Sequence, residues 1–209
     1  MITDRRRLGS DAEDRLAGRV GAAARAGVHL VQVRERDLDG GPFVRLVARC
    51  MDAVRGTRAR VLVNDRVDVA LAAGAHGVHL RADSVAASRV RRIAPAGFLI
   101  GRSVHSVTEA LRTAADGGAD YLLFGTVFPT ASKPGQAAAG TTALAEVVVA
   151  TSLPVLAVGG VTVATAPDVA RAGAAGIAAI ALFAHGSVES LHATVSAVIT
   201  AFDTPAGVP

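Results

Sequence analysis

The sequence RVLVNDRVDVALAAGAHGVHL, residues 60–80, contains a complete strand–helix–strand unit. Its two apolar runs, 60–63 and 77–80, are short and continuous, which is typical of parallel strands that are covered on both faces. Between them, residues 66–73 form a short helical segment, and Gly74 follows it, as glycine often follows a helix C-terminus. The segment therefore predicts a β–α–β unit, from which parallel sheets are built.

The same alternation of apolar runs and helical segments continues along the whole chain of 209 residues. It predicts strands at residues 2–4, 28–33, 60–63, 77–80, 98–101, 121–124, 155–158 and 177–183. It predicts a helix after each of them, at residues 11–26, 42–55, 66–73, 84–93, 107–116, 142–150, 162–172 and 188–202. Eight such units in a chain of this length favour a single-domain (β/α)8 TIM barrel over a doubly wound sheet. We therefore expect one α/β barrel domain over residues 1–209, in which 203–209 form a disordered tail.

Hydrophobic residues make up 51% of the chain and charged residues 19%, which indicates a globular rather than a disordered protein. The net charge is +4, but the arginines are spread along the chain and aromatic residues make up only 3%. We therefore expect an anionic small molecule and no nucleic acid as the partner. The single Cys50 cannot form an intramolecular disulfide, and no segment is apolar enough for a membrane span or a signal peptide. We expect a cytoplasmic protein without a membrane partner, and the sequence is compatible with a homo-oligomer.

In a barrel of this kind, the functional residues lie at the C-terminal ends of the strands. Polar side chains follow the predicted strands at that end: Gln32, Arg34, Asn64, Asp65, His79, Ser103, His105, Thr126, Thr130, Ser132 and Lys133. After the seventh predicted strand the chain has Gly159 and Gly160, at the position where a barrel commonly holds a phosphate on backbone N–H groups. We therefore expect a site for a phosphorylated ligand at this end of the sheet.

The loop GTVFPTASKPGQAAAG, residues 125–140, combines hydroxyl groups and three glycines with Lys133, the only lysine among 22 basic residues. A lysine ammonium is a compact point charge that serves at phosphate sites, and glycines suit a loop that closes over a ligand. A surface loop without a function is the alternative interpretation of this segment.

Four motifs, in order along the chain, resemble those of thiamin phosphate synthases. VQVRER at residues 31–36 resembles their Gln-x-Arg-x-Lys segment, and VNDRVDVALAAGAHGVHL at 63–80 resembles their third and fourth strand–helix units. GTVFPTASKPG at 125–135 resembles their Gly-Pro-x-Phe-x-Thr-x-Thr/Ser-Lys loop, and LPVLAVGGV at 153–161 resembles their Pro-x-x-Ala-Ile-Gly-Gly-Ile segment. The likeness covers nearly the whole chain. The same superfamily contains thiazole tautomerases, which share the barrel but not the coupling reaction.

The resemblance implies a role for each matching residue. The positions that hold the diphosphate and the pyrimidine are Gln32, Arg34, Asn64, Ser103, Thr130, Ser132 and Lys133. Asp65 matches a magnesium ligand. The positions that hold the thiazole phosphate are Gly159, Gly160 and the backbone around Ile180 and Ala181. Hydroxyls, amides and cations suit a diphosphate, and a carboxylate suits Mg²⁺.

The sequence also departs from the synthase pattern. Ser84 stands where that pattern has a second magnesium-binding aspartate, although Asp83 lies next to it. Thr126 replaces the proline of the loop, at the place where tautomerases can carry a histidine, and Ala181 replaces a serine. Ser84 and the segment GRSVHS, residues 101–106, look like the tautomerase branch.

Our main hypothesis is therefore a thiazole tautomerase-like isomerase that binds and aromatises a thiazole carboxylate phosphate. This chemistry needs a phosphate anchor, a cation for the carboxylate and one base, but no metal cofactor. Arg34 or Lys133 would hold the carboxylate, with Thr126 nearby in the loop. His79 and His105 are the candidate bases, because an unperturbed histidine titrates near neutral pH.

The alternative hypothesis is a thiamin phosphate synthase, a transferase that couples hydroxymethylpyrimidine diphosphate to thiazole phosphate and releases pyrophosphate. It would use Mg²⁺, held by Asp65 and Asp83. Two further alternatives remain open at this point. One is a non-catalytic barrel that binds the ligand as a regulator, and the other is a sugar-phosphate epimerase or isomerase, because phosphate binding alone does not define the chemistry.

Overall fold

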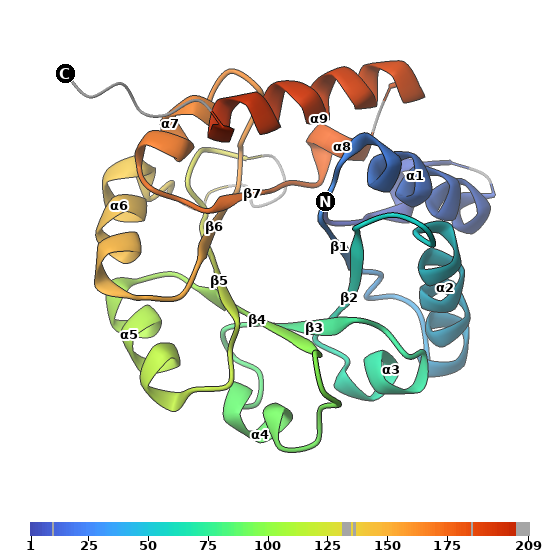
Figure 1. Ribbon diagram of the computed structural model, residues 1–209, viewed down its shortest axis with the longest axis horizontal. Helices are drawn as coiled ribbons and strands as arrows, with labels where there is room; N and C mark the ends of the chain where they lie inside the picture. The colour runs from blue at the N-terminus through green and yellow to red at the C-terminus, as the bar shows by residue number, and fades with distance from the viewer. Residues whose placement is uncertain (10, 131–134, 136, 185, 204–209) are drawn as a thin grey trace. The chain divides into compact units, whose positions relative to one another are not determined.

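The structure is a computed structural model that describes residues 1–9, 11–130, 135, 137–184 and 186–203 (Figure 1). The strands of this described part are β1 (Leu30–Val33), β2 (Arg60–Asn64), β3 (Gly77–Leu80), β4 (Leu99–Val104), β5 (Tyr121–Phe124), β6 (Val155–Val158) and β7 (Gly176–Ala178). The helices are the 3₁₀ helix η1 (Arg5–Arg7), α1 (Ala12–Ala26), α2 (Gly40–Ala53), α3 (Val67–Ala72), α4 (Ala87–Arg91), α5 (Val107–Asp116), α6 (Gly140–Ala150), α7 (Ala166–Arg171), α8 (Ala181–Ala184) and α9 (Val188–Asp203).

The strands follow one another in the sheet in chain order, β1 to β7, and helices alternate with them along the chain (Figure 1). The predicted α/β class with a parallel sheet is confirmed. Parallel strands need a crossover between them, and the helices supply it.

The predicted strand at residues 2–4 is wrong, and with it the count of eight strands. Ile2 forms only an isolated parallel bridge to Gln32. Around this bridge, Gln32 donates its N–H to the Met1 carbonyl and accepts the N–H of Thr3, both at 2.9 Å. The chain then turns into η1 at Arg5, so the apolar run is too short to extend the pairing.

The last predicted strand, 177–183, is also wrong in its second half. The strand β7 ends at Ala178, and Ala181–Ala184 form the short helix α8. The N–H of Phe183 donates to the Ile180 carbonyl at 3.1 Å, which closes a helical turn. The side chain of Phe183 is buried, so the apolar residues that suggested a strand serve a helix instead. In the predicted tail, Asp203 ends α9, and residues 204–209 lie outside the described part.

The chain divides into two compact units. Unit 1 comprises residues Met1–His79, Ala94–Leu99 and Ile180–Ser196. In it, β1 pairs with β2 and β2 with β3, all in parallel, and the branched residues that face one another are fully buried. Examples are Val31 opposite Val61 and Val63 opposite Val78. Helix α1 packs on α2, which brings Leu46 and Val47 of α2 into this core.

Unit 2 comprises residues Leu80–Ile93, Ile100–Ala179 and Ala197–Pro209. It contains β5, β6, β7 and nearly all of β4, again in parallel pairing. Its core is aliphatic except for Phe124, and it includes Leu122, Leu144, Val155 and Ala157. The expectation of a single domain over 1–209 stays a prediction.

Two general properties of the described residues bear on the sequence analysis. No helix among them is both long enough and apolar enough to cross a membrane.

Cys50 is buried in α2, and burial raises the pKa of its thiol to about 12. Because the thiolate is the reactive form, Cys50 is a core residue rather than a nucleophile.

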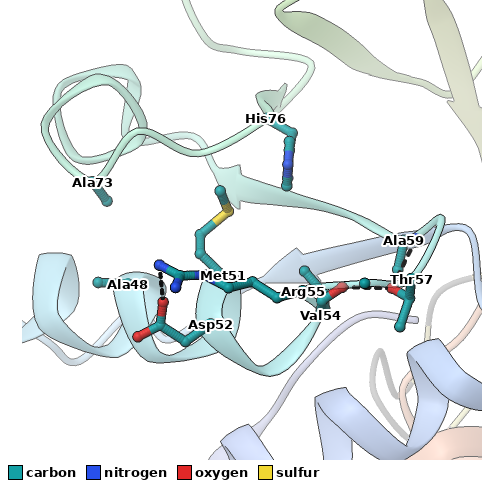
Figure 2. Close-up of a pocket in the computed structure, with 10 residues that line it drawn as sticks. Ala48, Met51, Asp52, Val54, Arg55, Thr57, Ala59, Ala73 and His76 are labelled. Atoms are coloured by element: carbon teal, nitrogen blue, oxygen red, sulfur yellow. Dashed lines mark hydrogen bonds and ion pairs between the residues drawn. The ribbon is translucent and has the colours of Figure 1, made fainter.

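A pocket of about 410 Å³ lies in unit 1 beside the C-terminal end of α2 (Figure 2). His76 and Met51 line it, and an ion pair between Arg55 and Asp52 at 2.8 Å forms part of its wall. Its described lining contains none of the predicted site residues. His76 has a structural role here, because its Nδ1 accepts the backbone N–H of Val61 at 3.0 Å.

We expect the stability of the protein to depend on the protonation of His76. Burial, and to a lesser extent Arg60, lowers the pKa of this imidazole from its ordinary value of 6.5. The neutral ring therefore contributes stability that is fully present above pH 6.5 and is lost as the pH falls through the lower folded-state pKa. The free energy of unfolding, measured by urea denaturation between pH 7.5 and 5, should fall more steeply for the wild type than for His76→Gln. The exposed His192 provides the control, and His192→Gln should keep the wild-type slope.

Candidate functional site

In unit 1, Gln32 and Arg34 lie at the C-terminal end of β1. They are two residues apart, and side chains alternate along a strand, so both belong to the same face. Gln32 is buried, and Arg34 is half-buried. Burial, with the nearby Arg36 adding to it, lowers the pKa of the Arg34 guanidinium. A partly desolvated guanidinium of this kind forms strong charge-assisted hydrogen bonds with an oxyanion.

Glu35 is a residue that the sequence analysis missed. It is only 2% exposed, although it lies in a charged segment. Its carboxylate accepts hydrogen bonds from the Thr3 hydroxyl and from the N–H of Arg5, the latter at 3.1–3.2 Å. Burial raises the pKa of Glu35, and these hydrogen bonds partly oppose the rise. Thr3 Oγ1 also accepts the N–H of Arg34 at 2.9 Å, so the network holds the backbone of a predicted site residue.

Asn64, Asp65 and His79 lie together where β2 and β3 end. Asn64 is the last residue of β2 and pairs with His79 in the register. The N–H of Asp65 donates to the His79 carbonyl at 2.9 Å, and the Asp65 carbonyl accepts the Val67 N–H at 3.1 Å. Asp65 has φ +64°, a left-handed conformation that among non-glycine residues is best tolerated by Asn and Asp. These three residues are thus neighbours, and Asn64 and His79 are buried.

Ile180 and Ala181 also belong to unit 1. Ile180 precedes α8 and its carbonyl accepts the N–H of Phe183, while Ala181 begins the helix and is exposed. The first N–H groups of a helix have no partner within the helix. Such donors suit a phosphate, which is the role that the resemblance implies.

In unit 2, the carboxylate of Asp83 is exposed and pairs with Arg81 at 2.6 Å. The turn that carries it is closed by two hydrogen bonds. The N–H of Arg81 donates to Ser84 Oγ at 3.0 Å, and the N–H of Ser84 donates to the Arg81 carbonyl at 3.1 Å. Ser84 is therefore a turn residue here, and Asp83 would have to leave Arg81 to bind a metal ion.

The half-buried Arg102 on β4 forms hydrogen bonds with the backbone of this turn. Its guanidinium donates to the carbonyls of Val85 at 2.6 Å, Ala82 at 2.8 Å and Ser84 at 3.2 Å. Three bonds from one planar fork leave the segment little freedom. The sequence analysis did not single out Arg102, because its partners are backbone atoms with no signature in the sequence.

We expect Arg102→Lys to loosen this turn. A lysine ammonium lacks the planar fork and cannot reproduce all three bonds, so the free energy of unfolding should fall by about 1–2 kcal/mol. Hydrogen–deuterium exchange, measured by mass spectrometry, should become faster at residues 82–85. Arg112→Lys, at an exposed position on α5, is the matched control and should change neither quantity. Unchanged exchange at 82–85 would show that Arg102 does not restrain the turn.

Ser103 and His105 lie at the end of β4 and directly after it. Ser103 is half-buried and lies opposite Leu123 of β5. Nδ1 of His105 hydrogen bonds to the Gly125 carbonyl, and its backbone N–H donates to Glu109 Oε2 at 2.7 Å. Because a carbonyl can only accept, Nδ1 carries the proton of this bond. The ring therefore joins the end of β4 to the beginning of the loop after β5.

The loop after β5 forms hydrogen bonds with the C-terminal end of β6. The N–H of Val127 donates to the Val158 carbonyl and the N–H of Phe128 to the Gly159 carbonyl, both at 3.0 Å. Thr126 is buried in this contact. Thr130 is half-buried, whereas Ser132 and Lys133 lie outside the described residues.

Gly159 and Gly160 have a packing role that the sequence analysis did not foresee. Both have positive φ, +101° and +63°. A Cβ on Gly159 would lie 2.5 Å from Cγ2 of Thr126, and a Cβ on Gly160 would lie 2.4 Å from the Pro129 carbonyl oxygen. The loop after β5 therefore requires glycine at both positions, whether or not a phosphate binds there.

The residues around Asp65 fit a magnesium ion. Mg²⁺ prefers oxygen ligands and is commonly bound by one or two carboxylates together with water and substrate phosphates. Asp65 is half-buried and carries such a carboxylate, and the buried Asn64 precedes it at the end of β2. Within the described part of the chain, three or more His, Cys, Asp or Glu side chains do not cluster as a complete metal cage would require.

Comparison with known proteins identifies the family. A family model described as "Thiamine monophosphate synthase" matches residues 1–183. The chain is 44% identical over 173 residues to a thiamine-phosphate synthase of Methanoculleus marisnigri, covering 80% of each chain. It is 39% identical over 205 residues to a thiamine-phosphate synthase of Roseiflexus sp., covering 95% of this chain and 85% of the relative.

A solved structure supports the same family assignment. Thiamine phosphate pyrophosphorylase from Pyrococcus furiosus superposes with a TM-score of 0.82 at 30% identity, covering 99% of this chain and 95% of that chain. A 3-hexulose-6-phosphate synthase superposes with a TM-score of 0.68 at 19% identity, covering 90% of this chain and 93% of that chain, which shows a likeness of fold alone. The fold is TIM-like, and the described residues form seven parallel strands rather than the eight that we predicted.

The tautomerase hypothesis is wrong. The relatives named above, at 39% and 44% identity, are thiamine-phosphate synthases, and none of the comparisons supports the tautomerase branch. The hypothesis rested on Ser84 and the segment GRSVHS, residues 101–106, which are less specific than the four motifs. The proposed roles of His79 and His105 as bases belonged to that hypothesis. The chain belongs to the thiamine monophosphate synthase family.

Proposed function

We propose that this protein is a thiamin phosphate synthase, which couples hydroxymethylpyrimidine diphosphate to thiazole phosphate and releases pyrophosphate. The observation that carries the proposal is the similarity, over 80–95% of the chain, to proteins named thiamine-phosphate synthase. The neighbouring Asn64 and Asp65 at the end of β2 support it, because they suit a Mg²⁺–diphosphate.

In this proposal, the residues of unit 1 bind the pyrimidine diphosphate. Gln32 and Arg34 donate hydrogen bonds to it, and the half-buried guanidinium of Arg34 offsets its negative charge. Asp65, with Asn64 beside it, would hold Mg²⁺, which when bound neutralises charge on the leaving diphosphate. The Thr3–Glu35 network keeps the backbone of Arg34 in position.

In the coupling step, the bond between the pyrimidine methylene carbon and the diphosphate oxygen breaks. The thiazole nitrogen then forms a bond to that carbon, and pyrophosphate leaves with the electron pair. Ser103, Thr130, Ser132 and Lys133 are the further proposed ligands of the diphosphate. Gly159, Gly160, Ile180 and Ala181 are the proposed backbone ligands of the thiazole phosphate. Asp83 is a second candidate for Mg²⁺ only if it exchanges Arg81 for the ion.

Direct measurement of thiamin phosphate tests the proposal. Purified protein is incubated with hydroxymethylpyrimidine diphosphate, thiazole phosphate and Mg²⁺, and the product is separated by chromatography. We expect product formation that stops in excess EDTA and is lost in Lys133→Ala but kept in Arg112→Ala, a surface arginine on α5. A folded wild-type protein that forms no product would refute the synthase.

The remaining expectations concern partners and location. We propose that the protein acts on small phosphorylated substrates in the cytoplasm. The absence of a nucleic-acid or membrane partner stays a prediction, and a homo-oligomer is compatible with the proposal.

A further inference from the structure

A second pocket in unit 1 has a lining rich in arginine. Its volume is about 320 Å³, and it lies along α1 beside the beginning of α9. Arg7, Arg15 and Arg19 contribute to the lining, together with Gly18 and Gly186. The described lining contains none of the residues assigned to the coupling reaction.

The three arginines differ in the hydrogen bonds and ion pairs that their guanidinium groups form. Nε of Arg7 pairs with Asp4 at 3.2 Å. Arg19 donates to the carbonyls of Phe183 at 2.8 Å and Gly186 at 2.6 Å. Among the described residues, the guanidinium of Arg15 has no hydrogen-bond or ion-pair partner. Two of the cations are thus held in place, and the third is available to a ligand.

The described lining of this pocket carries more positive than negative charge. Its described lining contains no Asp or Glu. Asp4 is shared between Arg6 and Arg7. Glu189 follows the lining residue Val188, but it is exposed, and a hydrogen bond from Ser187 lowers its pKa. Burial lowers the pKa of the Arg19 guanidinium.

The pocket also has open space where a side chain would otherwise lie. Gly18 is in the middle of α1, and a Cβ built on it would meet nothing within 4 Å. Glycine in the middle of a helix is destabilising by about 0.5–1 kcal/mol relative to alanine. The empty position beside Arg15 and Arg19 therefore leaves room for a small ligand at some expense of helix stability.

We propose that this pocket binds a phosphate-type dianion, namely inorganic phosphate, diphosphate or the phosphoryl group of a small molecule. The arginine fork matches phosphate oxygens in a bidentate manner, and the phosphate supplies the negative charge that the pocket lining lacks. A volume of about 320 Å³ is at the small end of the range for ligand pockets, which suits a ligand of this size. The proposal goes beyond the coupling reaction and does not depend on it.

Chemical protection of individual arginines tests this site separately from the proposed active site. Phenylglyoxal modifies guanidinium groups, and peptide mass spectrometry measures the rate at each arginine of the full chain. In a metal-free buffer at low ionic strength, diphosphate at ten times its dissociation constant should slow modification of Arg15 by about fivefold or more. Arg25, which is exposed on the same helix, should be slowed less than twofold, and so should Arg15 in chloride of equal ionic strength.

Three variants make the result specific. Gly18→Leu fills the pocket without removing a charge and should abolish the protection of Arg15 by diphosphate. Arg15→Gln should abolish the protection of Arg7, whereas Arg25→Gln should leave the protection of Arg7 and Arg15 at the wild-type level. Three results would each overturn the proposal. They are equal protection of Arg15 and Arg25, no protection of either residue, and full protection of Arg15 in Gly18→Leu. Inorganic phosphate in place of diphosphate should protect Arg15 as well, and stronger protection by diphosphate would identify a ligand with two phosphoryl groups.

Discussion

Asp65→Asn is expected to lower kcat/KM for thiamin phosphate formation by about 100-fold or more. Substituting a residue that merely supports a metal ligand typically costs ~10–100-fold, and loss of the ligand's own charge should cost at least as much. Asn has nearly the same shape as Asp and tolerates the left-handed backbone conformation at φ +64°. The substitution therefore removes the charge while it leaves the turn intact. Steady-state assays over a range of Mg²⁺ concentrations should show a higher Mg²⁺ requirement.

The matched control is Asp68→Asn, three residues further along the chain. Asp68 pairs with Arg66 at 2.6 Å on the surface, and an exposed ion pair contributes only about 0–1 kcal/mol to stability. This variant should keep its activity and its Mg²⁺ dependence. If Asp65→Asn and Asp68→Asn have equal activity in a protein that does form thiamin phosphate, Asp65 is not a ligand of the ion.

Gly160→Ala is expected to lower the free energy of unfolding by about 3 kcal/mol or more, because two costs add. The left-handed conformation at φ +63° is unfavourable for alanine by about 1–2 kcal/mol. The new Cβ would also lie 2.4 Å from the Pro129 carbonyl oxygen and 2.7 Å from that of Phe128. Backbone atoms cannot rotate away, so the loop after β5 must shift. Urea denaturation measures the loss.

Gly56→Ala separates the two costs. Gly56 has φ +75°, but a Cβ there would meet nothing within 4 Å. It should therefore show the conformational cost alone, about 1–2 kcal/mol. If the two variants lose the same stability, the close approach between Gly160 and the loop makes no energetic contribution. If Gly160→Ala loses more, the glycine pair is required for packing independently of any phosphate.

Much of the fold could be predicted from the sequence because the relevant signals are local. The unit at residues 60–80 appears in the structure as β2, α3 and β3, within one or two residues of the predicted boundaries. The errors occurred where an apolar run was short or ambiguous. Residues 2–4 form a single bridge, and the apolar residues after Ala178 form the helix α8. Periodicity cannot distinguish a short buried strand from a short buried helix.

The candidate site was predicted less completely. The sequence indicated Asn64, Asp65 and His79 because polar residues follow apolar runs, and in the structure these three are neighbours. It did not indicate Glu35 or Arg102. Glu35 lies in a charged segment but is buried by contacts with the N-terminal residues Thr3 and Arg5. Arg102 binds carbonyl groups about 20 residues away, and no residue type marks such a contact.

The sequence by itself determined the order of strands and helices, the polar residues at the strand ends and, through its motifs, the superfamily. These follow from hydrophobic periodicity and from the chemistry of single residues, which do not depend on distant parts of the chain. Only the tertiary structure decided that Glu35 is buried and that Arg7, Arg15 and Arg19 line one pocket. It also decided that the loop after β5 packs so closely on Gly159 and Gly160 that a Cβ at either position would clash with it. Burial and close approach are properties of pairs of segments, and those pairs form only when the chain folds.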